Sequence, residues 1–273
     1  MTTALCQLLK LQYPLIQAPM AGVATPQLAA AVSNAGALGS ISVGAVTPQQ
    51  AAEMIAHTQA LTRGPINVNV FCHAPARRDA AREAAWISRF SPQFAQYQTA
   101  LPPALTEIYQ SFLHNEAMLT VLEQAIRQHT TLPVVAAGGV MDGAGIATMM
   151  KLGASGVQLG TAFVLCPESA ASAAYRRALL AAGERGTVMT AAISGRQARC
   201  VRNAFCELCH DVTPEEIPDY PLTYALGKAL AAAAAAHGED GFGAQWAGQG
   251  VARARALPAA QLVETLVAEW QQA

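Results

Sequence analysis

Five short apolar runs separated by helical stretches constrain the fold of this chain more than any other feature. Each run is bounded by Gly or Pro and is too short for a helix, so each predicts a β-strand. The runs are PLIQA (14–18), ALGSISV (37–43), PINVNVF (65–71), LPVVAA (132–137) and GVQLGTAFV (156–164). Continuous apolar strands that alternate with helices indicate parallel βαβ units, and therefore an α/β fold class.

Helices are predicted between these strands and in the long intervals after the third and fifth runs. Thr25-Pro26 and Thr47-Pro48 each supply an N-cap followed by a proline at the first helical position. Between the third and fourth runs no strand is predicted, and a Pro- and Gln-rich connector is expected at Ser91–Ala104. The predicted helices are Pro26–Asn34, Pro48–Thr62, Asp79–Phe90, Leu105–Leu113, Ala117–His129, Ala144–Leu152, Ser169–Ala182, Leu222–Ala236 and Gln261–Gln271.

The composition excludes several classes of protein. The 17 Lys and Arg residues and the 18 Asp and Glu residues give a formal net charge of −1, so no basic surplus is present to neutralise the phosphates of a nucleic acid. Hydrophobic residues make up 52% of the 273 residues, which excludes disorder as the main state. The longest uncharged apolar tract, Ala229–Ala236, is much shorter than the ~20 residues of a membrane span.

The N-terminal stretch and the cysteines indicate a cytoplasmic protein. The N-terminus has no cationic segment, and Lys10 interrupts its apolar residues, so it is unlike a signal peptide. Six cysteines scattered over a long chain are typical of reduced thiols. Cys200, Cys206, Cys209 and His210 do cluster, but a structural zinc site usually has a second closely spaced pair. We therefore expect unpaired thiols and no metal.

Two glycine motifs follow the last two predicted strands. Gly138-Gly139 ends the fourth strand, and Gly160-Thr161 lies at the matching depth of the fifth. Glycines at the carboxyl ends of adjacent parallel strands expose backbone N–H groups with no Cβ in the way. The loops after the last two strands of a (β/α)8 barrel are the usual phosphate site. The pair predicts an anion site, while the alternative is that these glycines only make tight turns.

Two further positions are candidates for ligand contact. Strand 1 ends in Ala18-Pro19-Met20, a small-residue segment that lets a flat ring approach the backbone, although it is also compatible with a plain exit from the strand. Asn69 lies in the third strand, where a buried amide needs hydrogen-bond partners. It is either a structural bracket or a contact for the polar edge of a ligand.

The ordered motifs PLIQAPMAG, NAGALGSISVG, INVNVF, LPVVAAGGVMDG, GVQLGTAFV and TAAISGRQAR resemble the FMN-dependent nitronate monooxygenases, formerly called 2-nitropropane dioxygenases. The resemblance covers nearly the whole chain, including WAGQGVARARALPA near its end. It implies a TIM barrel, with FMN packed on Ala18, Pro19 and Met20 and hydrogen-bonded by Asn69. It also implies that the FMN phosphate lies on Gly139 and on the four residues Gln158, Leu159, Gly160 and Thr161.

The same resemblance implies a reaction. The family oxidises an alkyl nitronate, such as propionate 3-nitronate, to a carbonyl compound and nitrite, with dioxygen consuming the product radical. The flavin carries that chemistry, while the protein binds, orients and screens it. The expected partners are thus a small nitronate and dioxygen, with no nucleic acid and no membrane. Whether the chain forms a homo-oligomer is left open.

One departure from the family concerns catalysis. Family members carry three further βα units before the AAGG strand, one of which ends in a glycine-rich stretch with the catalytic histidine. Here the flanking segments are joined directly near Leu122-Glu123, so five of eight strands are expected and the catalytic residue is unknown. His73, after the third strand, and His114, in the helical insertion, are the two candidates to replace it.

The expected organisation is a single FMN-binding barrel-type domain over residues 1–273, incomplete as a (β/α)8 barrel. It would have a helical insertion at about 75–131 and a C-terminal helical region at about 168–273. Five parallel strands leave open hydrogen-bonding edges. Either the natural protein has residues that this sequence lacks, or the chain is a truncated relative, or copies complete one another. The functional alternatives are a catalytically impaired flavin-binding remnant and a related flavin-dependent enoyl reductase.

Overall fold

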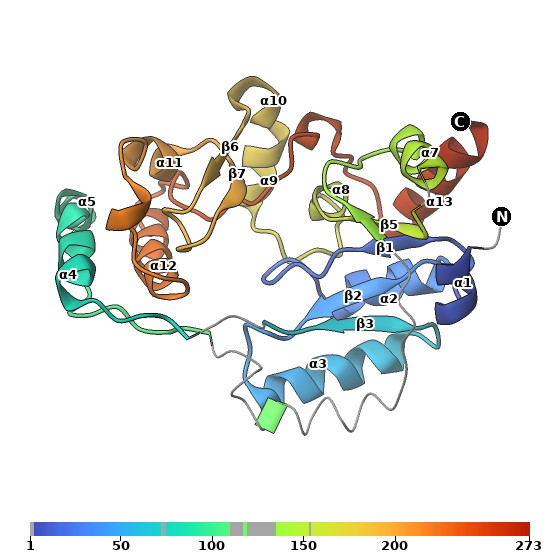
Figure 1. The fold of residues 1–273 in the computed structure, drawn as a ribbon, viewed down its shortest axis with the longest axis horizontal. Helices are drawn as coiled ribbons and strands as arrows, with labels where there is room; N and C mark the ends of the chain where they lie inside the picture. Colours follow the sequence, from blue (N-terminus) through green and yellow to red (C-terminus); the bar gives the residue numbers. More distant parts are fainter. Residues whose placement is uncertain (1–2, 72–74, 110–116, 119–134, 153) are drawn as a thin grey trace. The chain divides into compact units, whose positions relative to one another are not determined.

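The computed structural model describes residues 3–71, 75–109, 117–118, 135–152 and 154–273 (Figure 1). Their contacts divide the chain into two compact units. The first unit comprises Met1–His73, Ser111–Ser172 and Gly248–Ala273, and the second comprises Ala74–Gln110 and Ala173–Ala247. Each unit is described by itself. The single domain and its predicted boundaries stay predictions.

The first unit contains the five parallel strands that the apolar runs predict (Figure 1). In the described residues β1 pairs with β5, β5 with β4, and β2 with β3, all in parallel. Leu38 joins the two sheets, because its N–H donates to Leu15 O and its carbonyl accepts from Gln17 N, both at 2.9 Å. The strands are β1 (Leu15–Gln17), β2 (Gly39–Ser42), β3 (Ile66–Asn69), β4 (Val135–Ala137) and β5 (Gly156–Leu159).

The strand order distinguishes a barrel arc from an open doubly wound sheet. The order across the described strands is β4-β5-β1-β2-β3, so the last parallel strand lies beside the first. In a doubly wound sheet the fourth strand would take that place instead. First and last strands are neighbours in a (β/α)8 barrel. The first unit is therefore an arc of TIM-barrel type, confirmed over five strands.

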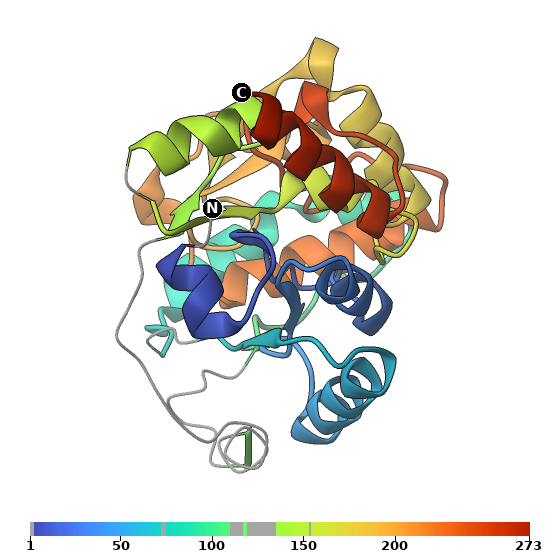
Figure 2. The same cartoon turned by 90° about the vertical axis from the view of Figure 1, so that its right-hand side faces the viewer.

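Helices cover the outer face of this arc. They are α2 (Pro26–Asn34), α3 (Pro48–Leu61), α7 (Gly143–Lys151), α8 (Thr161–Val164) and α13 (Ala259–Gln272). The predicted caps are confirmed, since Thr25 accepts from Leu28 N and Thr47 accepts from Gln50 N, each followed by proline. Figure 2 shows α7 beside α13. Their approach needs Gly143, where an added Cβ would lie 2.2 Å from Trp270 N.

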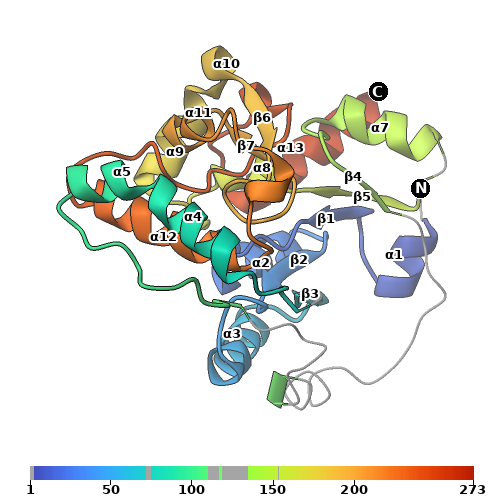
Figure 3. The same cartoon turned by 60° about the vertical axis from the view of Figure 1, so that its left-hand side comes forward.

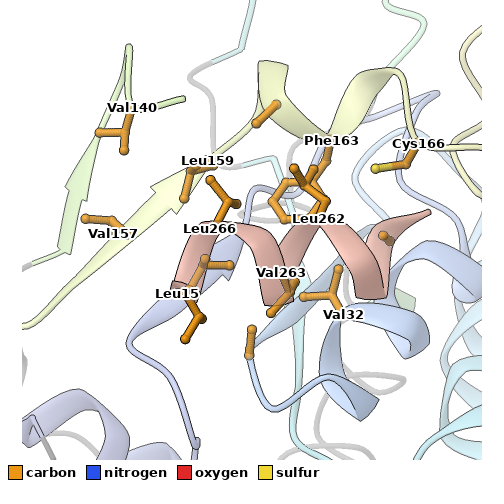
Figure 4. Packing of buried hydrophobic residues seen from close by; sticks show 14 of the residues in the cluster. Leu15, Val32, Val140, Val157, Leu159, Phe163, Cys166, Leu262, Val263 and Leu266 are labelled. Atoms are coloured by element: carbon orange, nitrogen blue, oxygen red, sulfur yellow. The ribbon is translucent and has the colours of Figure 1, made fainter. Parts of the chain in front are cut away.

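The main core lies between the outer face of β1, β5 and β4 and these helices (Figure 4). Leu159 and Phe163 are fully buried against Leu262 and Leu266 of α13. Fully burying one such side chain contributes about 1.5–3 kcal/mol. Alternate side chains of β1 and β5 therefore point toward the helices. The side chains between them point to the inner face of the arc.

The inner face of the arc changes character along the strands. Helix α1 (Ala4–Leu9), which the sequence did not predict, packs Leu5 against Ile16 and Leu38 at the amino ends. Toward the carboxyl ends the inner residues are polar. Asn67 donates to Ser40 Oγ at 3.1 Å, and the side chains of Ser42 and Asn69 are 3.5 Å apart. The inner face therefore presents polar side chains toward the carboxyl ends of β2 and β3.

The second unit is built from short helices around an aromatic core, with an antiparallel hairpin on one side. Trp86, Phe90 and Phe94 pack with Phe205 and with leucines of α12, and Figure 3 shows α4, α5 and α12 in this unit. The elements are α4 (Ala80–Arg89), α5 (Ser91–Gln96), α9 (Ala173–Leu180), α10 (Ala182–Arg185), β6 (Thr187–Thr190), β7 (Ala198–Val201), α11 (Ala204–Leu208), a 3-10 turn η2 (Pro214–Glu216) and α12 (Leu222–Ala235).

Several predictions of secondary structure were wrong. The fifth apolar run does not stay extended to Val164, because β5 ends at Leu159 and α8 follows. The connector at Ser91–Ala104 begins as helix α5, whose first turn holds a proline that is favourable there. Residues 105–109 are not helical, and the rest of that predicted helix lies outside the described residues. The C-terminal region contains the β6–β7 hairpin as well as helices.

Candidate functional site

The double glycine after β4 forms an open turn. Gly138 and Gly139 both have positive φ, 100° and 74°, a conformation that L side chains rarely adopt. An added Cβ at either position would meet no atom within 4 Å, so the space beside both residues is open. The turn therefore presents bare backbone to a ligand.

The turn after β5 lies against the exit of β1. At Gly160 an added Cβ would lie 3.5 Å from Ala18 Cβ and 3.6 Å from Met20 Sδ. The Met20 carbonyl accepts from Val23 N and Ala24 N, so the chain turns back immediately after this contact. Pro19, between the two contacting residues, is half-buried. The structure thus brings Gly160 together with the segment predicted to contact a flat ring.

A third segment, which the sequence analysis missed, joins this site. The backbone N–H of Gly248 donates to Thr161 Oγ1 at 2.9 Å. A Cβ on Gly248 would lie 3.8 Å from Gly139 N, and one on Gly250 would lie 3.2 Å from Gly139 O. Gly248 and Gly250 belong to the WAGQG motif that the sequence analysis quoted without a role. The two glycines separated by one residue are the sequence signal that could have identified this loop as part of the site.

Two arginines after this segment hold it in place. Arg253 donates to Asp142, the N-cap of α7, at 2.6 Å. Arg255 donates to the carbonyl of Met141 at 3.1 Å and to Glu269 of α13. The glycine loop at 248–250 is therefore fixed against the residues that follow Gly139.

We call Gly138, Gly139, Gly160, Thr161 and Gly248 the glycine cradle. Within the described residues, the amide N–H groups of Gly139 and Gly160 have no intramolecular acceptor. The Thr161 hydroxyl accepts from Gly248 and keeps its own proton for donation. Backbone N–H groups and a hydroxyl that converge without carboxylates make a site for an anion.

Of the other residues predicted to contact the cofactor, some can offer a side chain and others only their backbone. Gln158 lies on the inner face and is half-buried, so its amide is available to a ligand there. Leu159 is 1% exposed in the main core, which leaves only its backbone. Asn69 ends β3, where its carbonyl accepts from Val43 N at 2.8 Å. The described contacts do not link Asn69 to the glycine cradle, and its role stays a prediction.

The histidines supply no described catalytic group. His73 and His114, the two candidates, lie outside the described residues, as do His129 and the Leu122-Glu123 junction. Of the described histidines, His57 is exposed on α3, and His237 lies by the Tyr97 ring with its centroid 5.6 Å away. His210 is exposed after α11, with Nδ1 2.7 Å from Glu207 O.

The second unit contains a cluster that the sequence analysis also missed. Lys228 Nζ lies 4.8 Å from the centre of the Tyr109 ring and 5.3 Å from that of Tyr224. Tyr220 completes the tyrosine–lysine cluster, with its ring centre 6.3 Å from that of Tyr109. Burial raises the pKa of Tyr109 to about 12 and raises that of Tyr224 too. These phenols are therefore neutral hydrogen-bond donors beside a cation.

No carboxylate of the described residues forms an ion pair with that cation. The Lys228 side chain is exposed. Cation–π contact with two rings contributes about 0.5–1 kcal/mol at such an exposed site. The cluster is thus suited to a small anion with a short apolar part. Its sequence signal is the spacing of four residues between Tyr220, just before α12, and Tyr224 and between Tyr224 and Lys228, both within α12.

Comparison with known proteins identifies the family. The model of the nitronate monooxygenase family matches this chain in two stretches, residues 2–113 and 110–269. The chain belongs to the nitronate monooxygenase family. The family is one of oxidoreductases, so the chain is an enzyme of nitronate monooxygenase type. The resemblance stated from the motifs is confirmed.

Two curated relatives are similar over their whole length. A nitronate monooxygenase of Paraburkholderia phytofirmans is 42% identical over 348 aligned positions, which cover 98% of this chain and 95% of the relative. One of Pseudomonas aeruginosa is 39% identical over 350 positions, covering 98% and 99%. Both alignments are longer than the 273 residues of this chain. The relatives therefore have internal residues without a counterpart here, and the two family-model stretches meet at 110–113.

Solved structures agree with this assignment. A nitroalkane oxidase from Streptomyces ansochromogenes superposes with a TM-score of 0.84 at 29% identity, covering 99% of this chain and 98% of that one. FabK from Thermotoga maritima gives a TM-score of 0.69 at 25% identity, with 100% and 97% covered. The first is closer to this chain in both measures.

The described residues contain no group of three or more His, Cys, Asp or Glu side chains arranged to hold a metal ion. None of the described helices is both long and apolar enough to cross a bilayer.

Proposed function

We propose that this chain binds FMN at the glycine cradle and oxidises alkyl nitronates, such as propionate 3-nitronate, with dioxygen to a carbonyl compound and nitrite. The cradle is the observation that supports the cofactor. Three segments distant in sequence place bare backbone and one hydroxyl around an open space. Family membership supports the reaction class.

The residues present fit a flavin phosphate. Gly139 and Gly160 provide N–H groups without a protein acceptor, and Thr161 provides a hydroxyl proton. No carboxylate belongs to the cradle, since Asp142 is paired with Arg253 and caps α7. The exit of β1 at Ala18 and Met20, packed on Gly160, would support the ring system. When bound, FMN supplies the one-electron oxidation of the nitronate.

The tyrosine–lysine cluster is our candidate for nitronate binding. A nitronate is a small monoanion with an alkyl chain, and Lys228 with its neighbouring rings matches both parts. A charge-assisted hydrogen bond to such an anion contributes about 1.5–3 kcal/mol.

The decisive experiment measures colour and oxygen uptake together. We expect the purified chain to show the visible absorbance of bound flavin, alone or after addition of FMN, and to consume dioxygen with propionate 3-nitronate. A chain that stays colourless with excess FMN would refute the proposal. A yellow chain without oxygen uptake would retain the cofactor site and identify it as an impaired relative that lacks the catalytic histidine.

The alternative function, a flavin-dependent enoyl reductase, is tested with the same purified chain. Oxidation of NADH without any nitronate would favour the reductase alternative over the monooxygenase. We expect no such activity above the rate of free FMN, because the nitronate monooxygenases are closer in sequence than FabK is.

A further inference from the structure

Arg196 is a second cation beside the tyrosine–lysine cluster. Its Cζ atom lies 5.2 Å from the centre of the Tyr220 ring, within the range of a cation–π contact. The Tyr220 ring lies 6.3 Å from that of Tyr109, and the Tyr109 ring lies 5.7 Å from that of Tyr224. Lys228 contacts the last two rings. Arg196 and Lys228 therefore contact different rings of one group of three tyrosines.

The backbone fixes Arg196 beside the Tyr220 ring. Gly195 has φ 88°, and an added Cβ there would lie 2.5 Å from Tyr220 N and 2.8 Å from Pro218 O, so the two chain segments are in direct contact. The Ser194 hydroxyl accepts from Arg196 N at 3.4 Å and donates to Arg196 O at 3.1 Å. The main chain of Arg196 is thus held on both sides, while its side chain is exposed.

The charge of Arg196 is not used within the described residues, where its guanidinium forms no salt bridge. Arg196 lines an open cavity of about 390 Å³, together with the carboxylates of Asp219 and Glu215. Asp219 accepts from both the backbone N–H and the Nε of Arg77, each at 3.0 Å. Glu215 is exposed on η2 and is not paired with Arg196. The guanidinium can therefore bind a carboxylate from outside the chain.

We propose that Arg196 binds the carboxylate of propionate 3-nitronate while Lys228 attracts its nitronate group, so that the chain selects dianionic nitronates over simple alkyl nitronates. This inference rests on the proposed function. Propionate 3-nitronate carries its two charged groups at opposite ends of a short chain, and each group is planar with two oxygens. The rigid fork of an arginine matches a planar carboxylate, and the ammonium of a lysine acts as a point charge. Both side chains are exposed and have flexible stems, so their charged ends can adjust to the length of the ligand.

Binding of unreactive analogues tests the two cations without flavin chemistry. Succinate has the chain of propionate 3-nitronate with a second carboxylate in place of the nitronate group, and butyrate has the same length with one charge. The Trp246 ring lies 6.4 Å from that of Tyr224, so tryptophan fluorescence can follow the titration at constant ionic strength. We expect succinate to bind about tenfold more tightly than butyrate, through one additional charge-assisted contact. Equal affinities, or binding of neither, would overturn the proposal.

Variants assign this preference to Arg196. Arg196→Met should make the affinities for succinate and butyrate equal, and Arg196→Lys, which keeps the charge without the fork, should restore part of the difference. Arg82→Met is the matched control, because Arg82 lines the same cavity but pairs with Asp79. It should keep the tenfold preference. A similar loss in Arg82→Met would show that the positive charge of the cavity, and not Arg196, selects the dianion.

Oxygen uptake extends the test to the reaction. We expect the ratio of kcat/KM for propionate 3-nitronate to that for propyl-1-nitronate, which lacks the carboxylate, to fall about tenfold in Arg196→Met. Damage to the fold or to flavin binding would lower both values and leave their ratio unchanged. An unchanged ratio in an active variant would remove Arg196 from substrate selection. A chain that consumes no oxygen with either nitronate would refute the proposed function, and the succinate titration would still decide whether Arg196 forms an anion site.

Discussion

The side-chain oxygen of Thr161 lies 2.9 Å from the backbone nitrogen of Gly248, across 87 positions of sequence. This bond closes the glycine cradle, because it ties the turn after β5 to the segment that covers Gly139. We expect Thr161→Val to weaken FMN binding about tenfold, through loss of about 1.4 kcal/mol. Titration of flavin fluorescence measures the affinity. Thr148→Val, on the exposed face of α7, is the control and should leave the affinity unchanged.

Gly139 and Gly238 both have positive φ, so alanine variants of the two glycines separate the effect of backbone strain on stability from the effect on FMN binding. Gly139→Ala is expected to cost about 1–2 kcal/mol of stability, because Ala is disfavoured at positive φ. Gly238, which belongs to the second unit, has φ 80° and equally open surroundings. Gly238→Ala should therefore lower the melting temperature by a similar amount. Gly139→Ala alone should weaken FMN binding, and equal FMN affinity in the two variants would contradict the placement of the phosphate.

Predicting the strands from sequence succeeded where one physical signal determined the structure. The run at 37–43 and the Thr47-Pro48 cap gave β2 and the start of α3, because burial and capping are local. The hairpin of β6 and β7 was missed because its strands are short and half-polar and are joined by a loop over 191–197 rather than by a two-residue turn. Its pairing depends on contacts such as that of Cys200 with Trp246, which only the folded chain brings together.

The candidate site was predictable in part for the same reason. The glycines at 138–139 and 160 were found because they follow predicted strands that share one edge. Gly248 was missed because its partner, Thr161, is distant in sequence and no periodicity joins them. The tyrosine–lysine cluster was missed because Tyr109 and α12 meet only through the folding of the second unit. Leu159 was predicted as a contact because it stands in the phosphate motif, but its side chain is buried in the core, so only its backbone could contact a ligand.

Lys228 provides the test of nitronate binding. If it attracts the anion, Lys228→Met should raise the KM for propionate 3-nitronate about tenfold, as loss of one charge-assisted contact predicts. Lys228→Arg keeps the charge and should recover most of the affinity. Lys151→Met, on α7, is the control for loss of a lysine elsewhere. Steady-state oxygen uptake gives KM and kcat, and an unchanged KM in Lys228→Met would remove the cluster from the substrate site.

The Glu83 carboxylate predicts an acid-sensitive step in stability. Arg78 donates to both of its oxygens, at 2.9 and 2.6 Å, and the carboxylate is buried. This bonding lowers the pKa of Glu83 below its ordinary 4.5. Its contribution to stability is therefore fully present above about pH 4.5 and is lost as the pH falls through the lowered pKa. We expect the melting temperature to fall on acidification across that range.

A matched pair of variants isolates this contribution. Glu83→Gln removes the charge and should lower the free energy of unfolding at pH 7 by about 1–2 kcal/mol, because Arg78 loses a buried partner. It should also flatten the acid loss, since the titrating group is gone. Glu207 pairs with Arg202 where both side chains are more than half exposed. Glu207→Gln should therefore change stability by less than about 0.5 kcal/mol. Equal acid profiles for Glu83→Gln and the unaltered chain would show that another carboxylate controls acid unfolding.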